Sequence, residues 1–487
     1  KVISVPEKYV GRILGTRFSN KGNIETKSGT QIKVLSRRNA EGRDVDTVQL
    51  KIIGPQKNCD GAETRIKLCI AYCKEVMLRN EFGGDTHFVY FAFTDENEKF
   101  RLKPYVSSPI LNGFVHGERY RIETECDNNG DEDDCQEGDI SGETISDLKR
   151  HLLRALQNLK SSKEEKRLIS DLWCHFGKVL FCGVDEGEIK NTMTAVDLNE
   201  RIVNIASKDG RVDKGNNTEE FQKGYWRVSF EEGIDPKHIN DDQLPKPGDT
   251  VCEFFGLKLV STLWSYDFQF ETPSCRPVRL KAWEGLPPDS KQPPAEVKYL
   301  LRPVFIKANG DLTAWLCYPS TTVFRANVMS TKSRYDCRMK LRTGFRQVTE
   351  ENDVFFQEDE VLSDYLSNCR FDKAKHHLGL PNENDYKMPE GFACVFYRQA
   401  KERMFEATVD GDCFTVTLSN QNTWDSDSSQ KRHKEQFSLM VEMNSWSEAM
   451  LSPEQHWEPK EIVQKLESYM AFLSSLQTWI ILNKGEF

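Results

Sequence analysis

The sequence predicts an α+β protein of several domains, in which a small N-terminal module is followed by a larger, mainly antiparallel α+β body that ends in a helix. The chain has 487 residues, enough for about three domains. From about residue 190 the chain consists largely of short alternating apolar and polar runs, such as 226–230, which are typical of half-buried strands. The last apolar stretch, 458–483, instead spaces its apolar residues as one face of a helix.

The first 82 residues alternate between strand and helix patterns. An extended apolar run over 2–6 ends at a proline, and the apolar residues at 9, 10, 13 and 14 then follow helical spacing. A second helix is expected over 19–27, strands over 31–34 and 48–52, and a helix that ends near Leu78. The order of elements is therefore β-α-α-β-β-α.

The opening of the chain carries a specific motif, Val5-Pro6-x-x-x-Val10-Gly11-Arg12-Ile13-Leu14-Gly15. Further on, Ile24, Ser28-Gly29 and Ile32 follow at a gap-free spacing. This pattern resembles the eukaryotic type of KH domain, and the resemblance covers residues 1–82. It implies a nucleic-acid-binding fold. The core of that fold should contain Val5, Ile13, Leu14, Ile24, Ile32, Leu50 and Ile66.

The loop that a KH domain uses to hold a nucleic-acid backbone departs from the family pattern. The family clamps four nucleotides with Gly-x-x-Gly, whose glycines let backbone amides approach phosphates. Here the four residues are Gly15-Thr16-Arg17-Phe18, so an aromatic residue replaces the second glycine. The resemblance implies these candidate RNA-binding residues: Arg12, Gly15, Thr16, Arg17, Phe18, Lys21, Arg37 and Arg38.

Two interpretations of this loop remain open. In the first, Phe18 stacks on a base while Arg12, Arg17 and Lys21 contact phosphates. Arg37 and Arg38 would lie in a loop after the next strand, which borders the same groove in the family. In the second, Phe18 packs inward, and the domain has become a protein-binding or structural unit. Lys21 stands where the family normally has a buried aliphatic residue, which favours the second interpretation.

The distribution of charge indicates a local anionic partner. The whole chain has a net charge of −10, which argues against a protein that coats nucleic acid. Residues 1–82 hold 16 Lys/Arg and 9 Asp/Glu and so carry +7, whereas the remainder holds 50 and 67 and carries −17. No apolar run reaches the roughly 18 residues of a membrane span, so no membrane partner is expected.

The body divides provisionally into segments 83–140, 141–290 and 291–487. The first should contain strands over 87–93 and 118–122 and an acidic loop, and that loop lacks the carboxylate spacing of an EF-hand. The second should begin with two helices, one from about Ser141 and one over 168–173, before it turns to strands. The third should be mainly short strands before the final helix.

The sequence contains no recognised catalytic motif. A two-histidine phosphodiesterase domain, which follows a KH domain in some proteins, requires Ser or Thr two residues after each catalytic histidine. None of the nine histidines here has one. Phosphate-loop, dinucleotide-binding, zinc-protease and serine-hydrolase motifs are also missing. We therefore expect no catalytic residue, cofactor or metal, although carboxylate chemistry leaves no sequence signature.

The leading hypothesis is a non-enzymatic, RNA-associated regulatory or scaffold protein of the cytoplasm or nucleus. Its partners would be single-stranded RNA and other proteins. The first alternative is a purely protein-binding scaffold whose KH fold no longer binds nucleic acid. The second is an RNA-processing enzyme with no detectable signature, which a cluster of carboxylates or histidines in the body would favour.

Overall fold

A computed structural model describes most of the chain. The described residues are 1–14, 19–38, 44–83, 88–93, 99–105, 119–123, 140–161, 168–182, 184, 186–189, 191–201, 226–234, 257–273, 276–284, 300–307, 312–317, 321–333, 335–345, 356–425, 436–451 and 457–482. The predicted acidic loop lies outside them.

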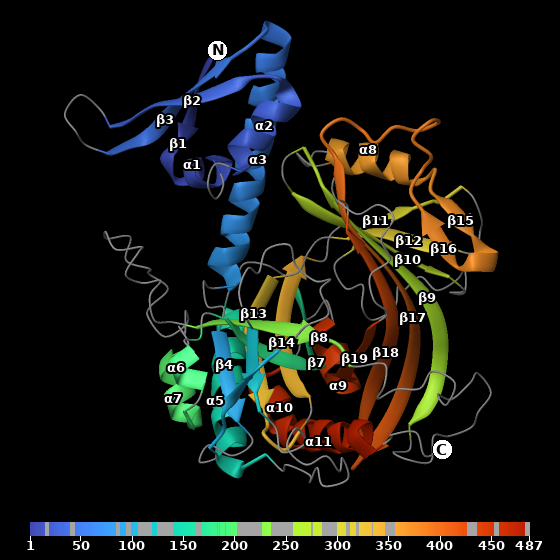
Figure 1. Ribbon diagram of the computed structural model, residues 1–487. Helices are drawn as coiled ribbons and strands as arrows, with labels where there is room; N and C mark the ends of the chain where they lie inside the picture. The colour runs from blue at the N-terminus through green and yellow to red at the C-terminus, as the bar shows by residue number, and fades with distance from the viewer. Residues whose placement is uncertain are drawn as a thin grey trace.

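The N-terminal module is a three-stranded sheet with helices on one side. Its elements are β1 (Val2–Pro6), α1 (Glu7–Leu14), α2 (Ser19–Ser28), β2 (Gln31–Arg38), β3 (Asp44–Ile53) and α3 (Gln56–Gly83). The strands lie in the order β1-β3-β2, and both pairings are antiparallel. In Figure 1 the long helix α3 runs from this module to the body.

The body is built mainly from long strands. Its first half contains β4 (Phe88–Phe93), β5 (Leu102–Pro104), β6 (Arg119–Ile122), α5 (Gly142–Ser161), β7 (Leu168–Cys182), α6 (Glu186–Ile189), α7 (Ala195–Arg201), β8 (Arg227–Glu232), β9 (Lys258–Glu271) and β10 (Pro277–Glu284). Its second half contains β11 (Leu300–Val304), β12 (Leu312–Cys317), β13 (Thr321–Met329), β14 (Asp336–Phe345), α8 (Phe356–Leu366), β15 (Arg370–Asp372), the short 3₁₀ helix η6 (Lys373–Lys375), β16 (His377–Gly379), β17 (Ala393–Val409), β18 (Asp412–Asp425), β19 (Gln436–Met443), α9 (Asn444–Leu451), α10 (Pro459–Gln464) and α11 (Leu466–Leu482).

One large, curved sheet of 14 described strands holds the body together (Figure 1). Its main path is β11-β12-β10-β9-β17-β18-β19-β7-β14-β13-β4, while β8 and β6 pair with the second half of β7. Only the β13–β4 pairing is parallel among the described strand pairs of this sheet. The sheet contains strands from all three segments of the body, 83–140, 141–290 and 291–487, and so joins these segments in one structure.

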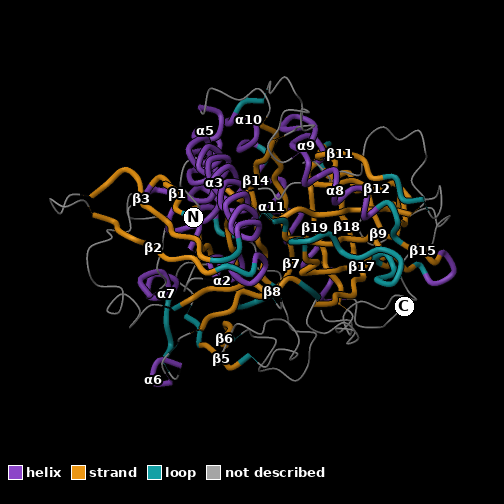
Figure 2. The backbone as a smooth tube through the Cα atoms, turned by 90° about the horizontal axis from the view of Figure 1, so that it is seen from above, coloured by secondary structure: helices purple, strands orange, loops and turns teal. Residues whose placement is uncertain are grey.

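One face of the sheet is apolar and carries the helices. Helices α5, α9, α10 and α11 pack on it around Leu152, Trp446 and Leu473, all buried. Figure 2 shows α5, α9 and α10 along one side of the body, with β5 and β6 on the opposite side. A second apolar cluster lies under α8 and the β15–β16 hairpin, around Phe268 and Leu362. The opposite face of the sheet has a polar middle, described below.

The strands expected over 87–93 and 118–122 are present as β4 and β6. The single helix expected over 458–483 is present as two helices, α10 and α11, which meet at Lys465. The prediction of a helix over 168–173 is wrong, because these residues form the start of strand β7. Buried Leu172, Cys174 and Phe176 alternate with residues of the polar face, which is the two-residue period of a strand. A short apolar run fits either period, so only pairing with neighbouring strands separates the two.

None of the helices that the structure describes is long and apolar enough to cross a membrane.

Candidate nucleic-acid interface

The N-terminal module has a closed hydrophobic core of its own. All seven predicted core residues are at most 5% exposed, from Val5 and Leu50 at 0% to Leu14 at 5%. They pack together with Tyr9, Val10 and Cys59. The predicted core is confirmed, and it holds α1 and the start of α2 on either side of the loop 15–18.

The structure describes only part of the predicted RNA-binding set. Gly15, Thr16, Arg17 and Phe18 lie outside the described residues, so the two interpretations of the loop stay open. Arg12 lies in α1, one residue before the buried Ile13. The described backbone therefore brings Arg12 and the start of α2 to the two ends of the same short connection.

The positions of Arg37 and Arg38 differ from the expectation. They were expected in a loop after the strand, but β2 extends to Arg38, which pairs with Asp44 of β3. The alternation that predicts the strand ends at Val34, and two irregularities interrupt the register beyond it. A strand continued through an irregular register loses its simple alternation, so the polar residues 36–38 resemble a loop in the sequence.

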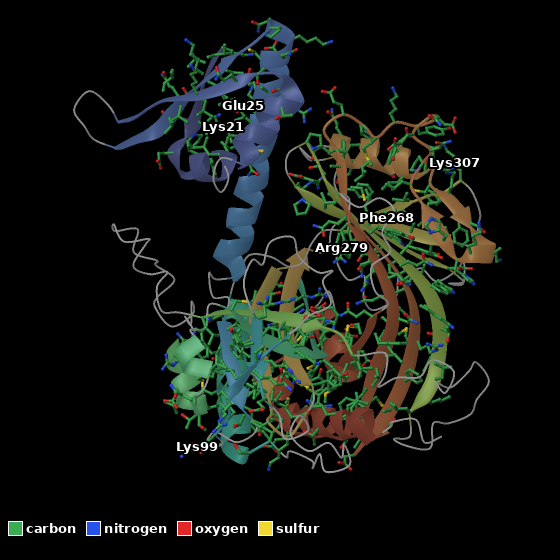
Figure 3. The ribbon with its side chains drawn as sticks, viewed as in Figure 1. Lys21, Glu25, Lys99, Phe268, Arg279 and Lys307 are labelled. Atoms are coloured by element: carbon green, nitrogen blue, oxygen red, sulfur yellow. The ribbon has the colours of Figure 1, made fainter. Side chains whose placement is uncertain are left out.

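Lys21 is held by an ion pair within α2. Its Nζ lies 2.8 Å from both carboxylate oxygens of Glu25, one helical turn on, and Figure 3 shows the two residues on the same helix. The Ile32 amide donates to Glu25 Oε1 at 2.6 Å. Burial alone raises the pKa of Glu25, but this amide and the Lys21 ammonium outweigh burial and keep the pKa below its usual range. Glu25 therefore ties α2 to β2, and it also offsets the charge of Lys21.

A second group of charged residues lies on the polar face of the large sheet. Because side chains alternate along a strand, Arg338, Lys340 and Arg342 of β14 all project to the face opposite the apolar core. Arg325 of β13 stands directly opposite Lys340 in the antiparallel register. We call these four residues the basic cluster.

Two carboxylates accompany the basic cluster. Asp171 of β7 accepts from Arg342 at 3.2 Å (Nε) and 2.8 Å (Nη2), and the Arg342 guanidinium stacks 3.9 Å from the Trp173 ring centre. Glu232 of β8 forms an ion pair with Lys340. Burial raises the pKa of Glu232, but the surrounding positive charges, His175 and Lys340 foremost, bring it well below its usual value.

The same face continues across β9, β10 and β17 as a network of paired charges. Asp267 is 1% exposed and accepts from Arg279 Nε at 3.0 Å, and Arg398 Nη2 lies 3.8 Å away. Ser265 adds a hydrogen bond of 2.5 Å to Glu402 on β17. The chief role of this network is therefore structural, since its ion pairs and hydrogen bonds tie neighbouring strands together.

No short motif in the sequence marks the polar face. Its one local signal is the alternation Arg338-x-Lys340-x-Arg342, which by itself indicates only a strand. The partners of these residues come from strands about 110 and 170 residues earlier in the chain. Among the described residues, no group of three or more His, Cys, Asp and Glu side chains is arranged to hold a metal ion.

The fold and core of the N-terminal module define it as a KH domain. A comparison with protein families agrees, since residues 1–68 match the KH domain family. The match covers the N-terminal module only. A comparison with curated proteins finds no match.

Among solved structures, two of S. pombe Pct1 RNA triphosphatase, one of them in complex with the Spt5 CTD, align with 69% of this chain. They are 11% identical to it, the alignment covers 93–94% of those chains, and the TM-score is 0.33. A likeness of this size carries no information on function.

Proposed function

We propose that this chain is an RNA-associated regulatory or scaffold protein that holds single-stranded RNA with a divergent KH domain. The observation that carries the proposal is the KH domain itself, with a charge of +7 on residues 1–82 of a protein whose net charge is −10. A locally basic module attracts the phosphate backbone, while the acidic remainder repels it. RNA would therefore bind at the N-terminal domain. The body would serve as a protein-binding scaffold without a catalytic role, in the cytoplasm or nucleus.

The contacts in this proposal differ in strength. Arg12 lies just before the loop that holds the backbone in the family, and Arg17 lies within that loop. Arg37 and Arg38 end the strand that borders the same surface. Lys21 contributes less to phosphate binding than the sequence alone indicates, because its ammonium group already forms an ion pair with Glu25. We assign phosphate contacts to the arginines, and base stacking to Phe18.

A purely protein-binding KH domain is the second candidate, and two observations favour it. Phe18 replaces the glycine that lets the backbone approach a phosphate, and the Lys21–Glu25 ion pair uses one of the nearby cations internally. In this case Phe18 would be a core residue, and its truncation would destabilise the domain by about 3–5 kcal/mol.

The deciding experiment measures binding of labelled single-stranded RNA to the full chain at several salt concentrations from about 0.1 M upward. If the KH surface binds RNA, Arg17→Ala should lower the slope of log affinity against log salt by about one. Lys21→Ala should leave that slope nearly unchanged, because Glu25 offsets the charge. Phe18→Ala should weaken binding at every salt concentration by about 1–3 kcal/mol.

The stability of each variant is measured in parallel, and Lys307→Gln serves as a control because it removes an exposed positive charge from the body, away from the KH domain (Figure 3). No RNA binding by the wild type at about 0.1 M salt would end the RNA proposal. Lowered stability of Phe18→Ala in that case would support the protein-binding candidate.

A further inference from the structure

The basic cluster places like charges next to one another inside the body. Arg325 and Lys340 are direct partners across the β13–β14 pair. Arg338 and Arg342 lie two residues on either side of Lys340 on the same face. Side chains directly opposite each other on antiparallel strands have Cβ atoms about 5 Å apart, and like charges in such positions destabilise a sheet. The fold nevertheless places the four positive charges of the basic cluster side by side on this face.

Internal carboxylates balance only two of the four cations. Asp171 pairs with Arg342 and Glu232 pairs with Lys340. In the part of the chain that the structure describes, no carboxylate forms an ion pair with Arg325 or Arg338. The Nε of Arg338 instead donates to the neutral Asn327 side chain at 2.7 Å, and its guanidinium lies 4.2 Å from the ring centre of Phe230. Two positive charges therefore remain.

The guanidinium groups of Arg325 and Arg338 have less contact with water than charged groups on a protein surface. Arg338 is 8% exposed and Asn327 is fully buried. Burial, and next the charge of Arg325, lower the pKa of Arg338 to about 9, and burial likewise lowers that of Arg325. The charge of Glu232 acts in the opposite direction on both groups, but the ion pair of Glu232 is with Lys340. Neither guanidinium group therefore has a paired counter-charge of its own among the described residues.

Hydrogen-bond donors without acceptors mark where that counter-charge belongs. The Nε atom of Arg325 and the Nδ2 atom of Asn327 are both buried and have no acceptor among the described residues. The two residues are neighbours on the polar face of β13, two positions apart. Buried donors of this kind are normally satisfied, so two side by side, next to surplus positive charge, indicate an anion with several oxygens.

We propose that Arg325 and Arg338, with Asn327 and Lys340, bind a phosphate group as a dianion on the polar face of the body. A phosphate dianion matches the two unpaired positive charges and accepts hydrogen bonds on several oxygens at once. Guanidinium groups hold such oxygens through paired N–H donors. Glu232, which is partly exposed at 38%, lies beside Lys340 and shows that solvent reaches this part of the face. The site is separate from the KH domain and is not needed for the function proposed above.

The test is a calorimetric titration of the full chain with sodium phosphate and with pyrophosphate near neutral pH, at an ionic strength held constant with sodium chloride. We expect saturable binding and a rise in the melting temperature with phosphate concentration. Absence of both effects in the wild type would overturn the proposal.

Three variants show where the anion binds. Arg325→Gln should weaken phosphate binding about tenfold or more, because a charge-assisted hydrogen bond and a full charge are lost. Arg325→Lys should keep the charge and lose the forked donors, giving an intermediate affinity. Lys307→Gln removes an exposed charge elsewhere and should bind as the wild type does. Equal weakening by Lys307→Gln and Arg325→Gln would mean non-specific attraction and would refute the site.

The melting temperature without phosphate separates a ligand site from a structural role. If the basic cluster is a ligand site, Arg325→Gln relieves like-charge repulsion in the absence of ligand. The melting temperature of this variant should then be equal to or higher than that of the wild type. A marked fall, with no phosphate effect on the wild type, would show that Arg325 serves the fold instead.

A further pair of probes distinguishes the source of the phosphate. A short RNA with a 5′-phosphate is compared with the same RNA with a 5′-hydroxyl. A higher affinity of the phosphorylated form, lost in Arg325→Gln, would assign the site to an RNA end. Equal affinities, with phosphate binding intact, would assign it to a small phosphate compound.

Discussion

At the scale of single residues, Gly177 allows two strands of the body to approach closely. It lies in β7 opposite Glu232 of β8. A Cβ atom at this position would lie 2.3 Å from the Glu231 carbonyl oxygen and 2.7 Å from the Phe230 ring. The first of these contacts is with the backbone, which cannot rotate away. Any side chain at position 177 would therefore push β8 and Glu232 away from β7.

We predict that Gly177→Ala lowers the free energy of unfolding by about 1–3 kcal/mol, as overpacking does in other cores. Urea denaturation measures it. Gly61→Ala is the matched control, because Gly61 lies inside helix α3 and an added methyl group there would meet nothing within 4 Å. That change should stabilise the chain by about 0.5–1 kcal/mol. Equal effects of the two variants would contradict the close approach.

A second residue, Asp336, makes stability depend on pH. Burial raises the pKa of this carboxyl to about 7, although the Val179 amide, which donates to it at 2.7 Å, and the charges of Arg121 and Lys178 act in the opposite direction. Between about pH 4 and about pH 7 the folded state therefore keeps a proton that the unfolded state has lost. This group's contribution to stability falls as the pH rises through that window.

Asp336→Asn should remove this contribution while keeping an acceptor for the Val179 amide. We expect a flatter dependence of unfolding free energy on pH from about 4 to about 7, measured by urea denaturation at each pH. Asp364→Asn, at an exposed position of α8, is the control and should leave the dependence as it is. The same slope in Asp336→Asn and the wild type would show that Asp336 does not titrate in this range.

At the scale of elements, helix α8 is attached to the sheet by a buried charge pair. Arg276, 1% exposed and just before β10, forms an ion pair with Asp359, 0% exposed in the first turn of α8. Its Nη2 also lies 3.7 Å from Glu358. Apolar residues Leu362 and Leu366 of the same helix pack on the sheet below. The helix is therefore held by a charge at one end and by apolar contacts along its length.

Arg276→Ala should lower the free energy of unfolding by about 3–5 kcal/mol, because it leaves two buried carboxylates without their cation. Arg370→Ala, which truncates an exposed arginine in the nearby β15, should change it by no more than about 0.5 kcal/mol. A chemical-denaturation series on both variants measures the difference. A small effect at Arg276 would mean that solvent reaches the pair.

At the scale of the whole molecule, the KH domain and the body have separate cores. The residues that pack around Val5 and Ile66 are all within the first 70, and none belongs to the clusters of the body. An ion pair of 3.5 Å links the two parts through Arg65 of α3 and Glu390, which is 87% exposed and so contributes little. Each part should therefore unfold largely by itself.

Ile13→Asp places an unpaired charge in the KH core, where Ile13 is 1% exposed. We predict that it lowers the melting transition of the KH domain and abolishes RNA retention, while the transition of the body keeps its temperature. Leu473→Asp, in the core of the body, should lower the melting transition of the body and leave that of the KH domain at its temperature. Scanning calorimetry separates the two transitions. A single transition that moves in both variants would show one cooperative unit.

The KH domain could be predicted from the sequence because its contacts are local. Val5, Ile13, Ile24 and Ile32 lie within 30 residues of one another, and the gap-free resemblance to the KH family pattern predicted that each lies in the core. The start of β7 could not be predicted in this way. Its run from Leu168 to Trp173 suits a helix as well as a strand, and the pairing with β14 that distinguishes them spans about 170 residues.

The candidate sites differ in the same respect. The residues of the KH loop are contiguous, so a sequence motif identifies them. The role of Lys21 depends on its ion pair with Glu25, and the contact of Glu25 with Ile32 forms only in the folded domain. The basic cluster is assembled from β13, β14, β7 and β8, which come together only when the sheet forms. Sequence periodicity indicates which face of a strand a residue is on, but not which strand lies next to it. The charge balance at Arg325 and Arg338 therefore became visible only in the folded chain.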